Sequence, residues 1–176
     1  MKTARFFLLF GALVFSCSNS QVGVNGFKWS SVHYFFDSGP LPPKYHYDFM
    51  ISINNDGHGN FVYNYGYDKG TPSATYELSV PKDSIALLDA VILESRILDN
   101  DIKPVPDNER PIGGSIKKIR VILPDTNRFL DRPPKVIESP EFPEKKYRTG
   151  LNKLYEIVER QVSVKIWDEL KMKREE

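Results

Sequence analysis

A long hairpin pattern constrains the fold of this chain more than any other feature. Residues 45–53 alternate with a period of two, so aromatic and isoleucine side chains share one face while mostly polar side chains share the other. Residues 54–60 are rich in Asn, Asp and Gly, which tolerate positive φ, and residues 61–65 return as a strand-like run. The pattern predicts two antiparallel strands joined by a turn.

Four other segments have the composition of strands. Residues 30–37 are rich in aromatic and β-branched side chains, and the paired prolines that follow them cannot lie in a paired central strand. Prolines also bracket residues 135–138, which leaves room only for a short edge strand. Two more strands are predicted at residues 75–78 and 116–123.

Apolar residues recur at helical spacing in two regions. The first region predicts an amphipathic helix that reaches about Leu98, with Ser79 as the candidate N-cap. The second, residues 151–170, predicts two short helices that meet near residues 161–163, where Ser163 can cap the second helix. Between the two regions, residues 99–114 carry prolines and paired glycines and are predicted to form a long loop, which is either functional or mobile.

These elements predict an α+β fold, a small antiparallel sheet with amphipathic helices packed on one face. Residues 27–174 have the length of one domain with a single core. The chain has only one cysteine, Cys17, so an intramolecular disulfide is excluded and the core alone must hold the domain together.

The amino terminus has the pattern of an export signal. Lys2 and Arg5 precede an apolar run at residues 6–15, which is too short for a membrane span of roughly 20 residues but suits a secretory signal. The run ends in Val14, Phe15, Ser16 and Cys17.

This ending resembles the lipobox of bacterial lipoproteins, the type II signal peptides. The resemblance implies that residues 1–16 are removed and that Cys17 is acylated, with palmitate among the chains, leaving residues 17–26 as a lipidated cysteine and short tether. Phe15 is bulkier than the family's usual Ala or Ser. If the signal peptidase rejected it, an ordinary secretory signal or an uncleaved anchor would remain, with Cys17 an unmodified thiol.

Lipidation predicts attachment to a membrane of the cell envelope through Cys17. Ser18 stands where an aspartate retains some lipoproteins at the inner membrane, so the sequence resembles an outer-membrane sorting signal. An envelope protein or peptide is the expected partner. The formal net charge is only +1, and clustered cations are missing, which argues against nucleic acid as a partner.

The sequence predicts no catalytic residue and no cofactor. No serine lies in a G-x-S-x-G motif, and the carboxylates of the 99–114 loop share a segment whose spacing fixes no distance between them. Gly113 and Gly114 precede a strand, whereas a phosphate-binding loop precedes a helix. The chain is therefore predicted not to be an enzyme, with an unrecognised envelope hydrolase as one alternative.

No metal site is predicted either. His33 and His46 lie on neighbouring predicted strands and His58 in the turn, and exposed polar positions account for the first two. The Asp-Gly pair in the turn resembles the centre of a calcium loop. In that register, however, Ser52 would be the first ligand and Tyr63 would replace the bidentate Glu, so a hairpin turn explains the pair better.

Aromatic residues crowd the hairpin. Phe49 and Phe61 are expected to face the helices while tyrosines cover the edge of the sheet. The alternative is that Tyr63, Tyr65 and Tyr67 form an exposed stacking surface for a peptide or glycan.

In outline, residues 48–162 resemble emfourin, a small inhibitor of thermolysin-type metalloproteases. The similarity rests on short segments and implies an inhibitory role without identifying an inhibitory residue. The sequence is therefore compatible with three functions. The preferred one is a tethered interaction or structural module, and the alternatives are a protease inhibitor and a hydrolase. The segments are Asp56-Gly57-His58-Gly59, Leu78-Ser79, Gly113-Gly114 and Leu151-Asn152-Lys153-Leu154.

Overall fold

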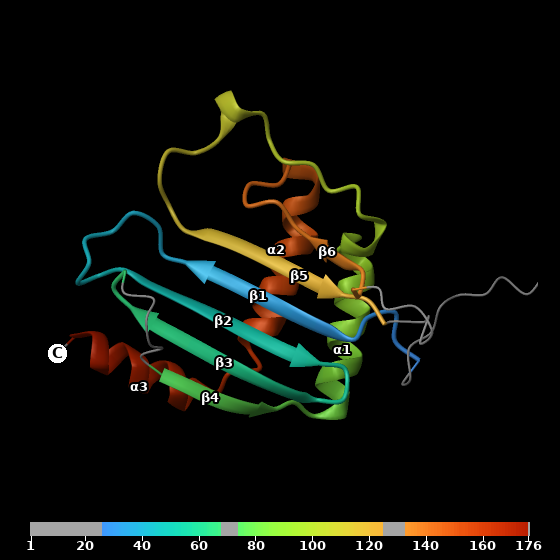
Figure 1. Cartoon of the computed structure of the whole chain (residues 1–176), viewed down its shortest axis with the longest axis horizontal. Helices are drawn as coiled ribbons and strands as arrows, with labels where there is room; N and C mark the ends of the chain where they lie inside the picture. Colours follow the sequence, from blue (N-terminus) through green and yellow to red (C-terminus); the bar gives the residue numbers. More distant parts are fainter. Residues whose placement is uncertain (1–25, 68–73, 125–132, 176) are drawn as a thin grey trace, which may run out of the picture.

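The predicted hairpin lies in a six-stranded antiparallel sheet with the order β4-β3-β2-β1-β5-β6 (Figure 1). The computed structural model describes residues 26–67, 74–124 and 133–175. Its elements confirm the predicted α+β class. The strands are β1 (Ser31–Asp37), β2 (Tyr47–Asn54), β3 (His58–Tyr65), β4 (Ala74–Ser79), β5 (Ile116–Ile122) and β6 (Val136–Glu138), and the α-helices are α1 (Lys82–Glu94), α2 (Lys145–Glu159) and α3 (Val164–Glu175).

A tight turn at Gly57 joins β2 to β3. Gly57 has φ of 92° and donates its N–H to the Asn54 carbonyl over 3.0 Å. A side chain at this position would also place its Cβ 2.6 Å from the Val80 carbonyl oxygen. Both the left-handed backbone and the close approach require glycine, so the hairpin turn accounts for the Asp56-Gly57 pair.

One face of the sheet forms the core with the helices. In β2 and β3 the buried side chains alternate, as the period of two predicts, and Ile51 lies opposite Phe61. The helices lie on one side of the sheet (Figure 1), which confirms the predicted layering. The buried apolar residues of α1 are the predicted Ile85, Leu88, Val91 and Ile92, and those of α2 include Leu151, Leu154, Tyr155 and Val158.

The ends of α1 differ from the sequence prediction. Ser79 is the last residue of β4, and α1 begins at Lys82 after Pro81, without a side-chain cap. The strand continues this far because the Val80 N–H pairs with the Gly57 carbonyl over 2.8 Å. At the other end α1 stops at Glu94, because Arg96 turns left-handed with φ of 61° and a 3₁₀ turn follows.

The long loop and the last two helices follow the predicted plan. Within residues 99–114, Val105 is buried and donates its N–H to the Phe142 carbonyl over 2.8 Å, so the loop is anchored at its base. The predicted break between two helices is confirmed at residues 160–163. There the Ser163 hydroxyl accepts a 3.4 Å hydrogen bond from the Ile166 N–H.

Gly150 marks the contact between α1 and α2. Replacing a helical Gly with Ala usually stabilises a protein by about 0.5–1 kcal/mol. Here the added Cβ would lie 3.0 Å from the Ser95 Cα, a backbone atom that cannot rotate away. We therefore expect Gly150→Ala to lower the free energy of unfolding in urea titrations.

The matched control is Thr149→Ala, at an exposed position on the same helix. It should leave stability unchanged or raise it by up to about 0.7 kcal/mol, because Ala has the better helix propensity. A gain in stability for Gly150→Ala would show that the two helices are not packed at this point as described.

Candidate functional site

The three tyrosines considered as a stacking surface do not share an exposed patch. Tyr63 is only 3% exposed, so its assignment to such a surface is wrong. Tyr63 lies on the helix side of β3, the same side as Phe61 two residues earlier. The period of two in the sequence already indicated that these two side chains share a face. Tyr65 is half-buried and donates its hydroxyl to the Leu170 carbonyl over 2.8 Å, while Tyr67 is exposed and stacks on His46.

The three histidines do not meet at one point either, although His33 and His58 line the same cavity. His33 lies opposite Ser52, whereas His46 precedes Ser52 by six residues, or about 20 Å of extended chain. Burial, followed by the charge of Arg120, lowers the pKa of His33. His46 was predicted to be exposed, but it is buried. Burial is tolerated because both ring nitrogens have polar partners, the Gly66 carbonyl at 2.6 Å and the Asp37 carboxylate at 3.2 Å.

Carboxylates of the long loop pair with local arginines. Asp99 accepts a 2.8 Å hydrogen bond from Arg96, and Asp107 lies 2.8 Å from Arg110. Within the described part of the chain, no three His, Cys, Asp or Glu side chains gather as a metal site would require.

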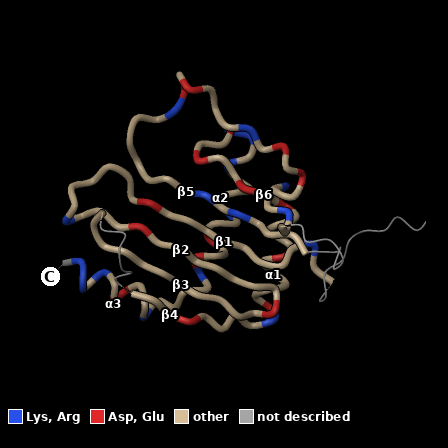
Figure 2. Tube along the Cα trace, viewed as in Figure 1, with Lys and Arg blue, Asp and Glu red and all other residues tan. Residues whose placement is uncertain are grey.

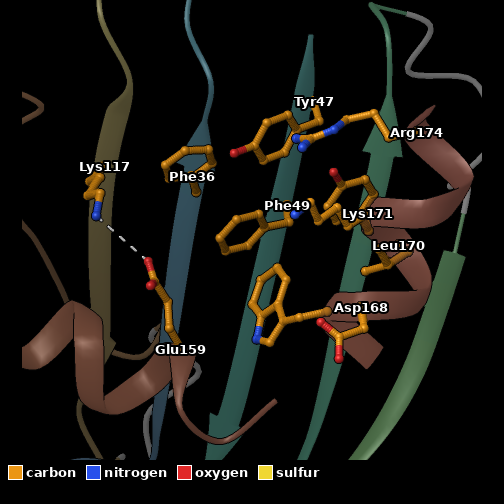
Figure 3. Close-up of a pocket in the computed structure, with 11 residues that line it drawn as sticks. Phe36, Tyr47, Phe49, Lys117, Glu159, Asp168, Leu170, Lys171 and Arg174 are labelled. Carbon is orange, nitrogen blue, oxygen red and sulfur yellow. Dashed lines mark ion pairs between the residues drawn. The ribbon is translucent and has the colours of Figure 1, made fainter. Parts of the chain in front are cut away.

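Among the described residues, the cavity with the most aromatic lining is a cleft of about 490 Å³ on the helix side of the sheet, near the carboxyl end of α2 and along α3 (Figure 3). We call it the aromatic cleft. Aromatic rings from the central strands and charged side chains from β5, α2 and α3 line it. Its lining residues are Phe36, Tyr47, Phe49, Tyr63, Lys117, Glu159, Trp167, Asp168, Leu170, Lys171 and Arg174.

Four nearly parallel rings form the floor of the aromatic cleft. Phe36 and Phe49 stack at 4.8 Å with an interplanar angle of 11°, and Tyr47 and Tyr63 at 5.6 Å with 9°. The Phe36 and Tyr47 rings lie 5.4 Å apart and join the two pairs. Phe49 and Tyr63 are buried while Phe36 and Tyr47 are half-buried, so the open surface of the floor belongs to Phe36 and Tyr47.

Trp167 fixes α3 as one wall of the cleft. Its ring lies 5.2 Å from that of Phe49 and 4.9 Å from that of Phe61. Further along the helix, Tyr76 donates a 3.2 Å hydrogen bond to Glu169. Because several strands hold α3, its inward-facing side chains have fixed positions relative to the floor.

Glu159 and Lys117 close the opposite side. The two side chains form an ion pair at 3.7 Å, drawn as the dashed line in Figure 3, and Glu159 also accepts a 2.6 Å hydrogen bond from the Tyr34 hydroxyl. Burial, followed by this hydrogen bond, raises the pKa of Tyr34 well above its ordinary range. The Tyr34 ring stacks on the ring of Tyr155, a residue of α2, at 5.1 Å. This stacking fixes the position of the Tyr34 hydroxyl that donates to Glu159.

On the α3 side the charge is positive. Figure 2 shows Lys and Arg gathered along α3 toward its carboxyl end. Arg174 lies over the Tyr47 ring at 4.9 Å, the geometry of a cation–π contact. Burial raises the pKa of Tyr63, and the charge of Arg174 opposes this shift. The cleft therefore offers ring faces for apolar contact and fixed cations for an anion.

Sequence reasoning missed the aromatic cleft because its lining comes from six separate elements. One available signal was the spacing of Trp167, Leu170 and Arg174 at i, i+3 and i+7, which places a cation on the same face as two apolar residues.

Neither a known family model nor a curated protein sequence matches this chain. Among residues 26–67, 74–124 and 133–175, no helix combines the length and apolar character needed to cross a membrane. The predicted lipobox and the cleavage site at Val14, Phe15, Ser16 and Cys17 lie outside the described residues.

The buried tyrosines predict a loss of stability at alkaline pH. Burial raises the pKa values of Tyr34, Tyr63 and Tyr155 in the folded protein, so above pH of about 10 the unfolded chain releases these protons while the folded protein keeps them. The free energy of unfolding should therefore fall as pH rises from about 10, by at most about 1.4 kcal/mol per pH unit for each tyrosine.

Tyr34→Phe should make this fall shallower in urea titrations at a series of pH values. Tyr45→Phe, at an exposed position, is the matched control and should keep the slope of the unsubstituted protein. Equal slopes for all three proteins would contradict a protected Tyr34 hydroxyl.

Proposed function

We propose that this chain is an exported protein of the bacterial cell envelope, anchored by lipid on Cys17 in the outer membrane, and that it acts as a non-catalytic interaction module. The observation that carries the proposal is the aromatic cleft, a preformed site with an apolar floor and charged walls. Its volume lies within the roughly 300–1,000 Å³ of sites that bind small organic ligands.

The chemistry of the cleft favours binding. Its lining consists of rings, cations, carboxylates and one leucine. The carboxylate of Glu159 is occupied by Tyr34 and Lys117, so it serves to orient Lys117 at the wall. Aromatic rings bind a ligand by stacking, and the charged side chains bind it by pairing with opposite charges.

The start of the folded domain fits a short tether. Trp29 is fully buried and donates its indole N–H to Asp89 over 2.9 Å, and its carbonyl accepts a 2.9 Å hydrogen bond from Asn55. Trp29, the first fully buried residue of the described chain, lies twelve residues after Cys17 in the sequence. A protein held by lipid at Cys17 would keep its domain close to the membrane surface.

Cys17→Ser tests the anchor. Serine cannot form the thioether, so the Cys17→Ser protein should carry none of the acyl chains that hold the unsubstituted protein in the membrane, and it should lose the label after growth with labelled palmitate. Intact mass spectrometry of the unsubstituted protein should show residues 1–16 removed and Cys17 acylated. The control Ser18→Ala should remain lipidated and membrane-bound. An unacylated Cys17, or a retained leader, would refute the anchor.

One observation favours the inhibitor as a second candidate function. The segment around η2 (Asp107–Glu109) projects from the body of the molecule (Figure 1), and the side chain of Ile112 is fully exposed. The loop is held at both ends, by Val105 at its base and by the contact of Gly39 with the Gly114 carbonyl. An anchored loop that presents an apolar residue is suited to insertion into a partner's pocket.

If the chain is an emfourin-like inhibitor, the lipid-free Cys17→Ser protein should inhibit a thermolysin-type protease in a peptide-cleavage assay. Ile112→Asp should then weaken inhibition at least tenfold, because it places a charge in an apolar pocket. Val164→Asp, at another exposed apolar position, is the control and should inhibit normally. A lack of inhibition by the lipid-free protein would exclude this candidate and leave the interaction module standing.

A further inference from the structure

We infer that the aromatic cleft binds an acidic peptide, with an apolar or aromatic side chain on the floor and a neighbouring carboxylate between Lys171 and Arg174. This inference deepens the proposed function, because it takes the cleft as the interaction site and names the chemistry of its ligand.

The floor is suited to one flat apolar group. Its open surface belongs to Phe36 and Tyr47, whose ring planes differ by 25°. Beside them, Phe49 and Tyr63 are buried, and each stacks on one of the two open rings. A side chain that lies on Phe36 and Tyr47 therefore meets a rigid, preformed ring surface and need not reorganise it.

The charges of the two walls are not equivalent. On the β5 side, Glu159 compensates Lys117 at 3.7 Å. On the α3 side, Lys171 and Arg174 form no ion pair with the described side chains, which end at Arg174, although Lys173 pairs with Glu169 at 2.8 Å. Among the side chains that the structure describes, the α3 wall thus holds two cations without an ion-pair partner, and an anion supplied by the ligand would complement them.

The two cations lie side by side. Residues three apart on a helix are neighbours on its surface, so Lys171 and Arg174 present their charges in the same direction. The Tyr47 ring supports the Arg174 guanidinium at 4.9 Å, which limits its freedom before a ligand arrives. A guanidinium presents paired donors that match a carboxylate, so Arg174 is the expected bidentate contact.

A peptide fits this combination better than a neutral glycan. A glycan could stack on the rings, but it would leave both cations of the α3 wall uncompensated. Asp168 lines the cleft one turn before Lys171 and would repel a ligand with several negative charges. A peptide that joins one carboxylate to one apolar side chain satisfies the floor, the cations and the carboxylate rim together.

Trp167 provides the readout for a test with the lipid-free Cys17→Ser protein. It lines the cleft, whereas Trp29, the other tryptophan of the chain, is fully buried beneath α1 residue Asp89. We expect acetyl-Phe-Glu-amide to change the tryptophan fluorescence saturably. Acetyl-Phe-Gln-amide and acetyl-Ala-Glu-amide, which lack the charge and the ring respectively, should each bind at least tenfold more weakly.

The carboxylate can come from an acidic side chain or from a chain end. Acetyl-Gly-Phe with a free carboxyl terminus, compared with its amide, separates these sources. Tighter binding of acetyl-Phe-Glu-amide assigns the cleft to an internal acidic segment, and tighter binding of the free terminus assigns it to the end of a chain.

The double variant Lys171→Gln/Arg174→Gln should weaken binding at least tenfold and remove most of its salt dependence. Lys165→Gln is the matched control, because it removes one cation from the same helix outside the cleft lining. Circular dichroism should show unchanged folding for both variants, since the substituted side chains form no ion pair with a described residue.

Binding of acetyl-Phe-Glu-amide that is unaffected by the double variant would overturn the inference, as would no fluorescence change with any of the peptides. Saturation by chitotriose alone would instead assign the cleft to a glycan. Each of these results leaves the proposed lipid anchor intact, because the mass of the mature protein tests the anchor independently.

Discussion

The packing of Trp167 against Phe49 and Phe61 is the contact on which the candidate site depends. It lays α3 against the ends of the central strands, where α2 has already ended at Glu159. Full burial of one large apolar side chain is worth about 1.5–3 kcal/mol, and the half-buried Trp167 contributes part of that amount to the docking of α3. Without a docked α3, the aromatic floor would be an open sheet surface and the cleft would have one wall.

The walls of the cleft have different electrostatic roles because their neighbours differ. Tyr34 and Lys117 satisfy Glu159 on one side, and a hydroxyl with a raised pKa remains a donor to that carboxylate at neutral pH. On the other side, Arg174 rests on a ring rather than on an acid. A cation supported by a ring keeps its charge available to a ligand, which makes the site selective for an anion next to an apolar group.

The proposed anchor and the cleft fit one arrangement. A lipidated Cys17 would stand only twelve residues before Trp29, the first fully buried residue that the structure describes. The cleft lies at the other end of β1, lined by Phe36 near the carboxyl end of that strand. A module tethered through the residues before β1 would have its binding site at the opposite end of that strand.

The sequence by itself determined the strands, the helices and their buried faces. Alternation in residues 45–53 identified Phe49 and Ile51 as core residues, and the helical spacing of Ile85 and Leu88 did the same for α1. These patterns are local, and a local period fixes which side chains share a face. The period in β3 also placed Tyr63 beside Phe61, although composition alone suggested an exposed patch.

Only the tertiary structure decided where helices cover that face and where they leave it open. The cleft combines residues from six elements, and its existence depends on α2 ending where α3 crosses the sheet. The close approach of α1 and α2 is likewise a tertiary feature, because Gly150 lies against Ser95, a residue 55 positions earlier in the sequence. The extent to which a helix covers the sheet depends on contacts between segments that are distant in the sequence. The spacing of residues within one segment carries no information about those contacts.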